Sequence, residues 1–139
     1  MTQFQGPIAL TGRILLALMF VISGFNKINA YGGTQQYMEA FGVPGTLLPL
    51  VILLELVGGL MIAAGFFTRI TALALAGFTL VAAVLFHANF SDQVQTIFFM
   101  KNLSIAGGFL MLAAFGPGIL SVDARRAGGE IAGSGVSAA

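Results

Sequence analysis

The sequence contains no cysteine and no tryptophan, and it has a single histidine. Without cysteine the chain cannot form a disulfide, bind an iron–sulfur cluster or offer a thiolate zinc site. His87 alone cannot supply a two-histidine haem site. We therefore predict no metal site and no covalently bound cofactor, so any redox chemistry would require a diffusible carrier or a partner subunit.

The low content of charged residues indicates the class of protein to which the chain belongs. Charged residues make up 8% of the 139 residues and hydrophobic residues 58%, whereas typical soluble domains are roughly 25% charged. Six Lys/Arg and five Asp/Glu cannot solvate the surface of a soluble globule. Because no basic cluster is present, the sequence also excludes nucleic-acid binding. The composition indicates a protein that is surrounded by the lipid bilayer.

Four apolar stretches are each about 20 residues long, the length that a helix needs to cross a bilayer core of about 30 Å. They cover residues 8–28, 47–67, 70–90 and 97–115. We expect the first to remain as a span, because no Lys or Arg precedes it as in a signal peptide. The sequence thus predicts an all-α integral membrane four-helix bundle, as a single domain over residues 1–126.

Two segments outside the spans carry patterns of their own. Residues 34–41 predict a short extra helix in the first outward loop, with Thr34 as N-cap. Tyr37 and Phe41 would share a face of that helix against the membrane surface, and an irregular loop is the alternative. Residues 127–139 are rich in Gly, Ala and Ser without an apolar period, so we expect a disordered tail.

Lys and Arg residues near the span ends predict the orientation. Four spans place both termini on one side, together with Arg13, Arg69, Arg125 and Arg126, while Lys27 and Lys101 fall on the opposite side. This excess predicts cytoplasmic termini in a bacterial inner membrane. We interpret the four arginines as structural or topology anchors rather than as ligands.

Glu55 is the most informative residue within the spans. It lies eight positions after Leu47, which is about 12 Å along a helix and close to the bilayer midplane. A charged side chain at that depth costs about 2.5–3.5 kcal/mol on insertion scales. Glu55 must therefore be paired, protonated or in contact with water, and both Lys27 and Lys101 are candidate partners.

Polar side chains from all four spans fall in the same outward half of the predicted bundle. The candidate ligand-binding residues are Glu55, Lys27, His87, Lys101, Asn102 and Asn26. Phenylalanines lie at the same level: Phe20, Phe25, Phe86, Phe90, Phe98 and Phe99. A carboxylate, a lysine and a histidine among aromatic walls suit a quinone headgroup whose tail leaves into lipid. The alternative is that Glu55 pairs with a lysine only to hold the bundle together.

Short motifs spread along nearly the whole chain, up to Arg126, carry a further signal. They are Gly12-Arg13-Ile14-Leu15, Ser23-Gly24-Phe25-Asn26-Lys27, Gly42-Val43-Pro44, Leu54-Glu55-Leu56-Val57-Gly58-Gly59, Gly65-Phe66-Phe67-Thr68-Arg69, Phe86-His87, Lys101-Asn102-Leu103, and Gly116-Pro117-Gly118 with Ser121 and Asp123. In these motifs the sequence resembles the DoxX family of small four-helix bacterial inner-membrane proteins.

The resemblance implies a four-helix membrane bundle and a link to redox proteins. The family name comes from subunits associated with a terminal quinol oxidase and with thiosulfate:quinone oxidoreductase. Other members are described as membrane partners in oxidative-stress complexes. The resemblance supplies no catalytic residue that could be assigned to a position of this chain.

Three functions agree with these observations. The first is a redox-associated subunit that binds quinone or quinol near the periplasmic face, with a partner redox subunit or as a homo-oligomer. In it, Glu55 and His87 would handle protons, while Lys27, Lys101 and Asn102 would position the headgroup. The second is a non-enzymatic scaffold or assembly partner of a respiratory or oxidative-stress complex. The third is a carrier of a small molecule or of protons.

Overall fold

The computed structural model of the chain describes residues 2–134, which contain helices and no strand. Four helical segments are long and apolar enough to cross a membrane. They are α1 (Gln5–Asn29), α3 (Leu48–Ala64, extended at its start by a 3-10 turn over Gly45–Leu47), α4 (Thr68–Phe86) and α5 (Gln93–Phe115). The predicted all-α membrane protein is thereby confirmed.

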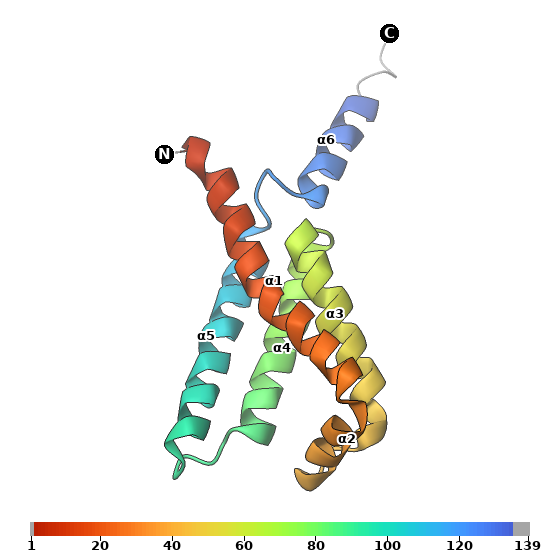
Figure 1. Cartoon of the computed structure of the whole chain (residues 1–139). Helices are drawn as coiled ribbons and strands as arrows, with labels where there is room; N and C mark the ends of the chain where they lie inside the picture. The colour runs from red at the N-terminus through yellow and green to blue at the C-terminus, as the bar shows by residue number, and fades with distance from the viewer. Residues whose placement is uncertain (1, 135–139) are drawn as a thin grey trace.

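Two shorter helices mark the two ends of the molecule. α2 (Tyr31–Ala40) lies between α1 and α3 in the chain, and α6 (Val122–Ser134) follows α5. Both chain termini lie at the α6 end in Figure 1, whereas α2 and the α4–α5 loop lie at the opposite end. These two ends are called the α6 end and the α2 end below.

The ends of the spans differ from the apolar stretches because local capping, rather than hydropathy, sets them. α5 begins at Gln93, four residues before Ile97, because the Asp92 carboxylate accepts a hydrogen bond from the backbone N–H of Val94 at 2.9 Å. α3 ends before Gly65, which adopts a left-handed φ of 71° that glycine tolerates best.

α2 confirms the predicted extra helix and corrects its cap and its surroundings. The Thr34 hydroxyl donates to the Ala30 carbonyl at 2.8 Å from inside the helix, so it is not the N-cap. Tyr37 and Phe41 pack against Phe86 of α4, with ring centroids 5.5 and 5.3 Å away. This face of α2 therefore covers the end of α4, where the sequence predicts contact with the membrane surface.

α6 is a helix through Ser134, where the sequence predicts a disordered tail from residue 127; residues 135–139 lie outside the described part. The Asp123 carboxylate accepts from the backbone N–H groups of Phe67 and Thr68, both at 2.9 Å, and from the Thr68 hydroxyl at 2.7 Å. Burial raises the pKa of Asp123, but these hydrogen bonds outweigh it and hold the pKa below its usual value. Asp123 thus caps α4 and fixes the first turn of α6.

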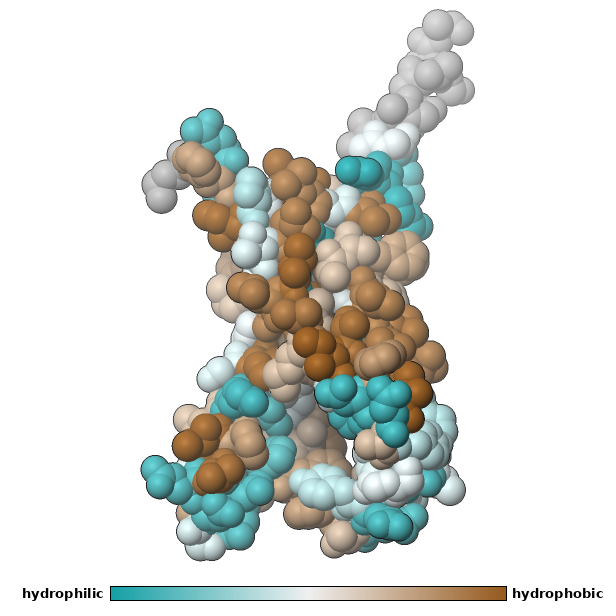
Figure 2. Space-filling model, in the orientation of Figure 1, coloured by the Kyte–Doolittle hydropathy of each residue, from teal (hydrophilic) through white to brown (hydrophobic). Residues whose placement is uncertain are grey.

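The spans form two close pairs, α1 with α3 and α4 with α5. Glycine allows the first pair to approach: a Cβ on Gly24 would lie 3.1 Å from the backbone nitrogen of Leu56, and one on Gly59 would lie 2.9 Å from Val21. The pairs meet in a buried core at mid-height that includes Ala17, Phe20, Ile62, Leu75, Ala106 and Phe109. On the face shown in Figure 2, hydrophobic surface covers this level, and hydrophilic patches lie toward the ends.

Candidate functional site

Glu55 of α3 and Lys27 of α1 form an ion pair in which Glu55 is buried and Lys27 is partly buried. Lys27 Nζ lies 2.9 Å from Glu55 Oε2 and donates to Oε1 at 3.1 Å. Ser23, one turn before Lys27, accepts from Nζ at 2.6 Å and donates to Oε1 at 3.4 Å. The predicted pairing of Glu55 with a lysine is confirmed, and the partner is Lys27.

The close approach of α1 and α3 explains why these side chains meet. Gly24 packs on the backbone at Leu56, and the sequence neighbours of these two residues are Ser23 and Glu55. Ser23 and Lys27 are four residues apart and so share one face of α1. The helix contact therefore places both groups beside the carboxylate.

The carboxylate keeps one oxygen available. Glu55 is only 5% exposed. Although Oε2 is within ion-pair distance of Lys27, the angles do not make a hydrogen bond, and no other donor among the described residues supplies one. A buried carboxylate oxygen without a hydrogen-bond donor is costly. Glu55 Oε2 is thus an acceptor that a bound ligand could satisfy.

A cavity of about 430 Å³ lies beside the ion pair, within the size range of small-molecule sites. It is referred to below as the site cavity, and its polar lining residues are Ser23, Lys27, Thr34, Tyr37, Glu55, Thr79, His87 and Asn102. The rest of its wall is mostly aliphatic and aromatic, with Phe20, Phe78 and Phe86 among the residues. The cavity draws on all four spans and on α2.

His87 lies at the C-terminal end of α4 and reaches the cavity wall. Its Nδ1 lies 2.7 Å from the side-chain oxygen of Gln95, at the start of α5. In the tautomer that donates from Nδ1 to this amide oxygen, Nε2 of the neutral ring is left as an acceptor.

Asn102 of α5 also lines the cavity and is 8% exposed. Its side chain makes no hydrogen bond to any residue in the described range 2–134. An amide carries two donors and an acceptor, so its burial without partners is unfavourable unless water or a ligand binds to it. Asn102 therefore adds both kinds of hydrogen-bonding group to the cavity.

Two predicted site residues lie outside the cavity. The Lys101 ammonium lies over the ring of Phe98, 5.0 Å from its centroid, and the residue is exposed. Asn26 is exposed on α1 and lines a separate open groove. Of the six predicted ligand-binding residues, the structure thus brings Glu55, Lys27, His87 and Asn102 to one cavity.

The sequence analysis missed the contribution of the first loop to the site. Thr34, Tyr37 and Met38 of α2 and Val43 after it line the cavity. The aromatic residues Tyr37 and Phe41 are the sequence feature that could have indicated this contribution, but the sequence analysis assigns them to the membrane surface. Tyr37 faces the cavity because α2 folds back over the end of α4.

The arginines at the α6 end make structural contacts. Arg69 donates to two carbonyl oxygens in the last turn of α5, at 2.9 and 2.7 Å. Arg126 lies over the ring of Phe67, 5.1 Å from its centroid, and Arg125 is exposed. Arg69 thus satisfies carbonyl groups that a helix C-terminus leaves free.

Arg13 differs from the other three because it is 1% exposed. Its Nη2 donates to the carbonyl oxygen of Leu120, in the segment that leads into α6. The Arg13 guanidinium and the Ser121 side chain both lie close to Gly65 and leave no room for a Cβ on this glycine. Arg13 therefore joins α1 to the α3–α4 turn and to the start of α6.

Comparison with known proteins agrees with this architecture. Residues 8–88, which include most of α1 and all of α2, α3 and α4, match the DoxX family. The chain is 60% identical over 123 residues to the inner membrane protein YqjF of Escherichia coli (strain K12), covering 88% of this chain and 95% of that protein. It is 42% identical over 123 residues to the inner membrane protein YphA of the same strain, covering 84% and 88%.

A more distant relative is CatD of Bacillus subtilis (strain 168), named as a candidate oxidoreductase. It is 29% identical over 73 residues, which cover 52% of this chain and 54% of CatD. No solved structure matches the chain. The range matched by the family contains Lys27, Glu55 and His87, whereas Asn102 lies beyond it.

Proposed function

Because the chain belongs to the DoxX family of inner-membrane proteins, we propose that it is a redox-associated membrane subunit that binds the headgroup of a quinone or quinol in the site cavity. The observation that carries this proposal is unfilled hydrogen-bonding capacity in the wall of a mostly apolar cavity. Glu55 Oε2 is paired with Lys27 but accepts no hydrogen bond, and the Asn102 amide, in a residue 8% exposed, faces the same cavity.

The cavity supplies hydrogen-bonding groups for both oxidation states. Quinone carbonyl oxygens require donors, which Lys27 Nζ and the Asn102 amide provide. Quinol hydroxyl groups require acceptors, which Glu55 Oε2 and His87 Nε2 provide. Reduction of a quinone adds two electrons and two protons; the electrons would come from a partner redox subunit, and Glu55 and His87 are the groups that would exchange protons.

The relatives support a redox role without naming a ligand. CatD, which is 29% identical to part of this chain, is named as a candidate oxidoreductase. The names of the two nearer relatives give a location only. The quinone assignment therefore rests on the chemistry of the cavity.

The orientation of the bundle follows from its basic residues. We propose that the α6 end faces the cytoplasm, because Arg69, Arg125 and Arg126 lie there with both termini, while Lys27 and Lys101 lie toward the α2 end. An alkaline phosphatase fused to the C-terminus, which is active only in the periplasm, should be inactive. An active fusion would reverse the assignment and place the site cavity toward the cytoplasm.

Quinone binding is tested with protein purified in mild detergent from membranes that contain quinone. The wild type should retain quinone above the amount that partitions into an empty detergent micelle, as quantified by extraction and chromatography. Asn102→Leu should lower the retained amount about tenfold, since it removes hydrogen bonds to the headgroup. Glu55→Gln should also lower it, since it replaces the charged acceptor paired with Lys27 by a neutral amide. Asn102→Leu is the more informative variant because its amide has no protein partner to lose.

Ser104→Ala is the matched control for Asn102→Leu. Ser104 lies on the exposed side of α5 and its hydroxyl is already bonded to the Met100 carbonyl at 3.0 Å. It should retain quinone like the wild type. Retention at background by the wild type would contradict quinone binding and favour a scaffold, whereas proton flux in liposomes that requires Glu55 would favour a carrier.

A further inference from the structure

Side chains of α2 and its neighbours cover the site cavity on the side of the α2 end. Tyr37 of α2 and Phe41, the residue that follows this helix, pack with Phe86 of α4 at the cavity, with ring centroids 5.0–5.5 Å apart. Met38, on the same helix, is 5% exposed. Aromatic and aliphatic side chains therefore separate the cavity from the aqueous side.

Hydrogen bonds hold this cover in place. The Gln35 side-chain amide donates to the Gly45 carbonyl at 3.2 Å, and the backbone N–H of Val43 donates to the Met38 carbonyl at 3.0 Å. Both contacts tie α2 to the segment that leads into α3. Movement of α2 away from the cavity would break these contacts and the aromatic stack together.

The side of the bundle between α1 and α5 is different. The two helices touch at mid-height, where the rings of Phe20 and Phe109 lie 5.3 Å apart and Gly108 packs on Leu16. From there they separate toward the α2 end (Figure 1), and the surface between them is hollowed in the lower half of Figure 2. The second half of α1 borders this opening (Figure 1).

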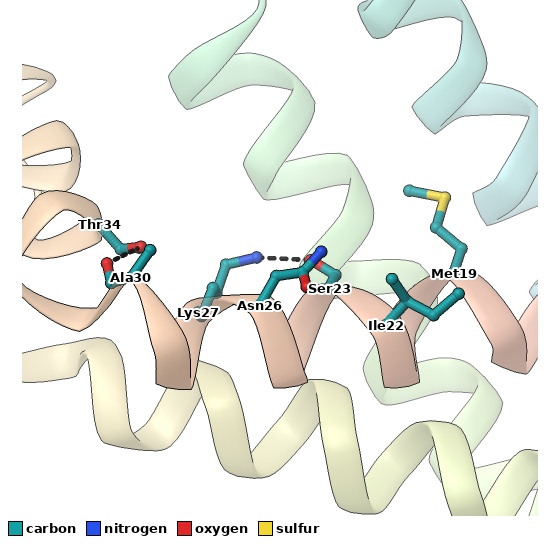
Figure 3. A pocket seen from close by; sticks show the side chains of 7 residues that line it. All are labelled: Met19, Ile22, Ser23, Asn26, Lys27, Ala30 and Thr34. Atoms are coloured by element: carbon teal, nitrogen blue, oxygen red, sulfur yellow. Dashed lines mark hydrogen bonds between the residues drawn. The ribbon is translucent and has the colours of Figure 1, made fainter.

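An open groove of about 500 Å³ runs along α1 at this opening (Figure 3), and it is called the side groove below. It is lined by Met19, Ile22, Ser23, Asn26, Lys27, Ala30 and Thr34. Four of these residues, Met19, Ser23, Lys27 and Thr34, also line the site cavity. The groove and the cavity therefore lie next to each other, on either side of these four residues.

The side groove follows the second half of the α1 span, with Ala30 and Thr34 beyond its end. Ile22 and Phe25, on the same stretch of helix, expose 49% and 57% of their surface, as apolar side chains that contact lipid do. The Lys27 side chain is 25% exposed even though it is paired with the buried Glu55.

We infer that the ligand of the site cavity enters sideways from the lipid phase between α1 and α5, and that its apolar tail lies in the side groove. This inference rests on the proposed function and narrows the ligand to an amphiphile with a small polar ring and a long hydrocarbon tail. Because lipid chains are as apolar as the groove, the groove adds little affinity. Its role is to let the tail stay in lipid while the cavity encloses the headgroup.

Photolabelling in lipid nanodiscs tests the route. The probe is a quinone with a diazirine at the far end of a short isoprenoid tail, and labelled residues are mapped by mass spectrometry. We expect label in residues 19–30 of α1, suppressed by an excess of the same quinone without the diazirine. Ile22→Trp, which fills the groove from an exposed position, should reduce this label roughly fivefold or more.

Phe25→Trp is the control, since Phe25 is exposed on α1 at the same height but does not line the groove. It should be labelled like the wild type. A different result would overturn the lateral route and leave the quinone site intact. In that result, suppressible label appears in α2 or in residues 41–47, and Ile22→Trp is labelled there as strongly as the wild type. No suppressible label together with no retained quinone would overturn the proposed function itself, and the route with it.

Discussion

Lys27→Met is expected to destabilise the protein by about 3 kcal/mol, because it leaves the buried Glu55 without its cation. Replacing both residues, as Lys27→Met with Glu55→Leu, should bring the stability back to within about 1 kcal/mol of the wild type, since no buried charge then remains. The measurement is the free energy of unfolding in mixed detergent micelles for the wild type, both single variants and the double variant. The four values form a double-mutant cycle.

Lys101→Met is the matched control, because Lys101 is exposed and its ammonium lies over the face of Phe98. Its loss should cost roughly 0.5 kcal/mol. Equal losses for the two lysine variants would show that the Lys27–Glu55 pair does not hold α1 to α3.

The double variant also separates the two interpretations of the ion pair. It is expected to fold and yet to retain no quinone, because both the Lys27 donor and the Glu55 acceptor are gone from the cavity. A double variant that folds and retains quinone like the wild type would mean that the pair is structural only. The proposed roles of these two residues in binding would then be wrong.

The depth of Glu55 in its span could be predicted from sequence, and so could its need for a cation. What could not be predicted is the rotation of each helix about its axis. Lys101 and Asn102 are adjacent, so about 100° separates them around α5, and hydropathy does not tell which one faces inward. Packing of α4 against α5 settles this, with Asn102 buried and Lys101 exposed.

Contacts at the α6 end explain why composition alone does not predict the helix that continues beyond residue 126. Gly, Ala and Ser beyond residue 126 indicate disorder when only local sequence is considered. The first turn of α6 instead carries a carboxylate, Asp123, bonded to groups 55 and 56 residues earlier in the chain, at Thr68 and Phe67. Such contacts depend on the α3–α4 turn and the end of α5 lying side by side, which no local pattern contains.

Gly65→Ala is expected to be the most damaging single-methyl change at that end. The residue has a φ of 71°, where a Cβ costs roughly 1–2 kcal/mol. An added Cβ would also collide with the Arg13 guanidinium, in addition to lying 2.5 Å from Ser121 Cβ. Since both neighbours are buried, relief requires movement of α1 or α6, and overpacking of this kind costs about 1–3 kcal/mol more. We expect a total loss of roughly 3 kcal/mol in the free energy of unfolding.

Gly77→Ala is the comparison variant, and we expect it to raise the free energy of unfolding rather than lower it. Gly77 lies inside α4 with no atom within 4 Å of its added Cβ, so the change should stabilise the helix by about 0.5–1 kcal/mol. Neither change touches the site cavity, which lies toward the α2 end. The quinone retained per folded molecule should therefore stay at the wild-type level in both variants, although Gly65→Ala lowers the yield of folded protein. Tolerance of Gly65→Ala within about 0.5 kcal/mol would contradict the role of the Arg13–Gly65 contact in joining α1, the α3–α4 turn and α6.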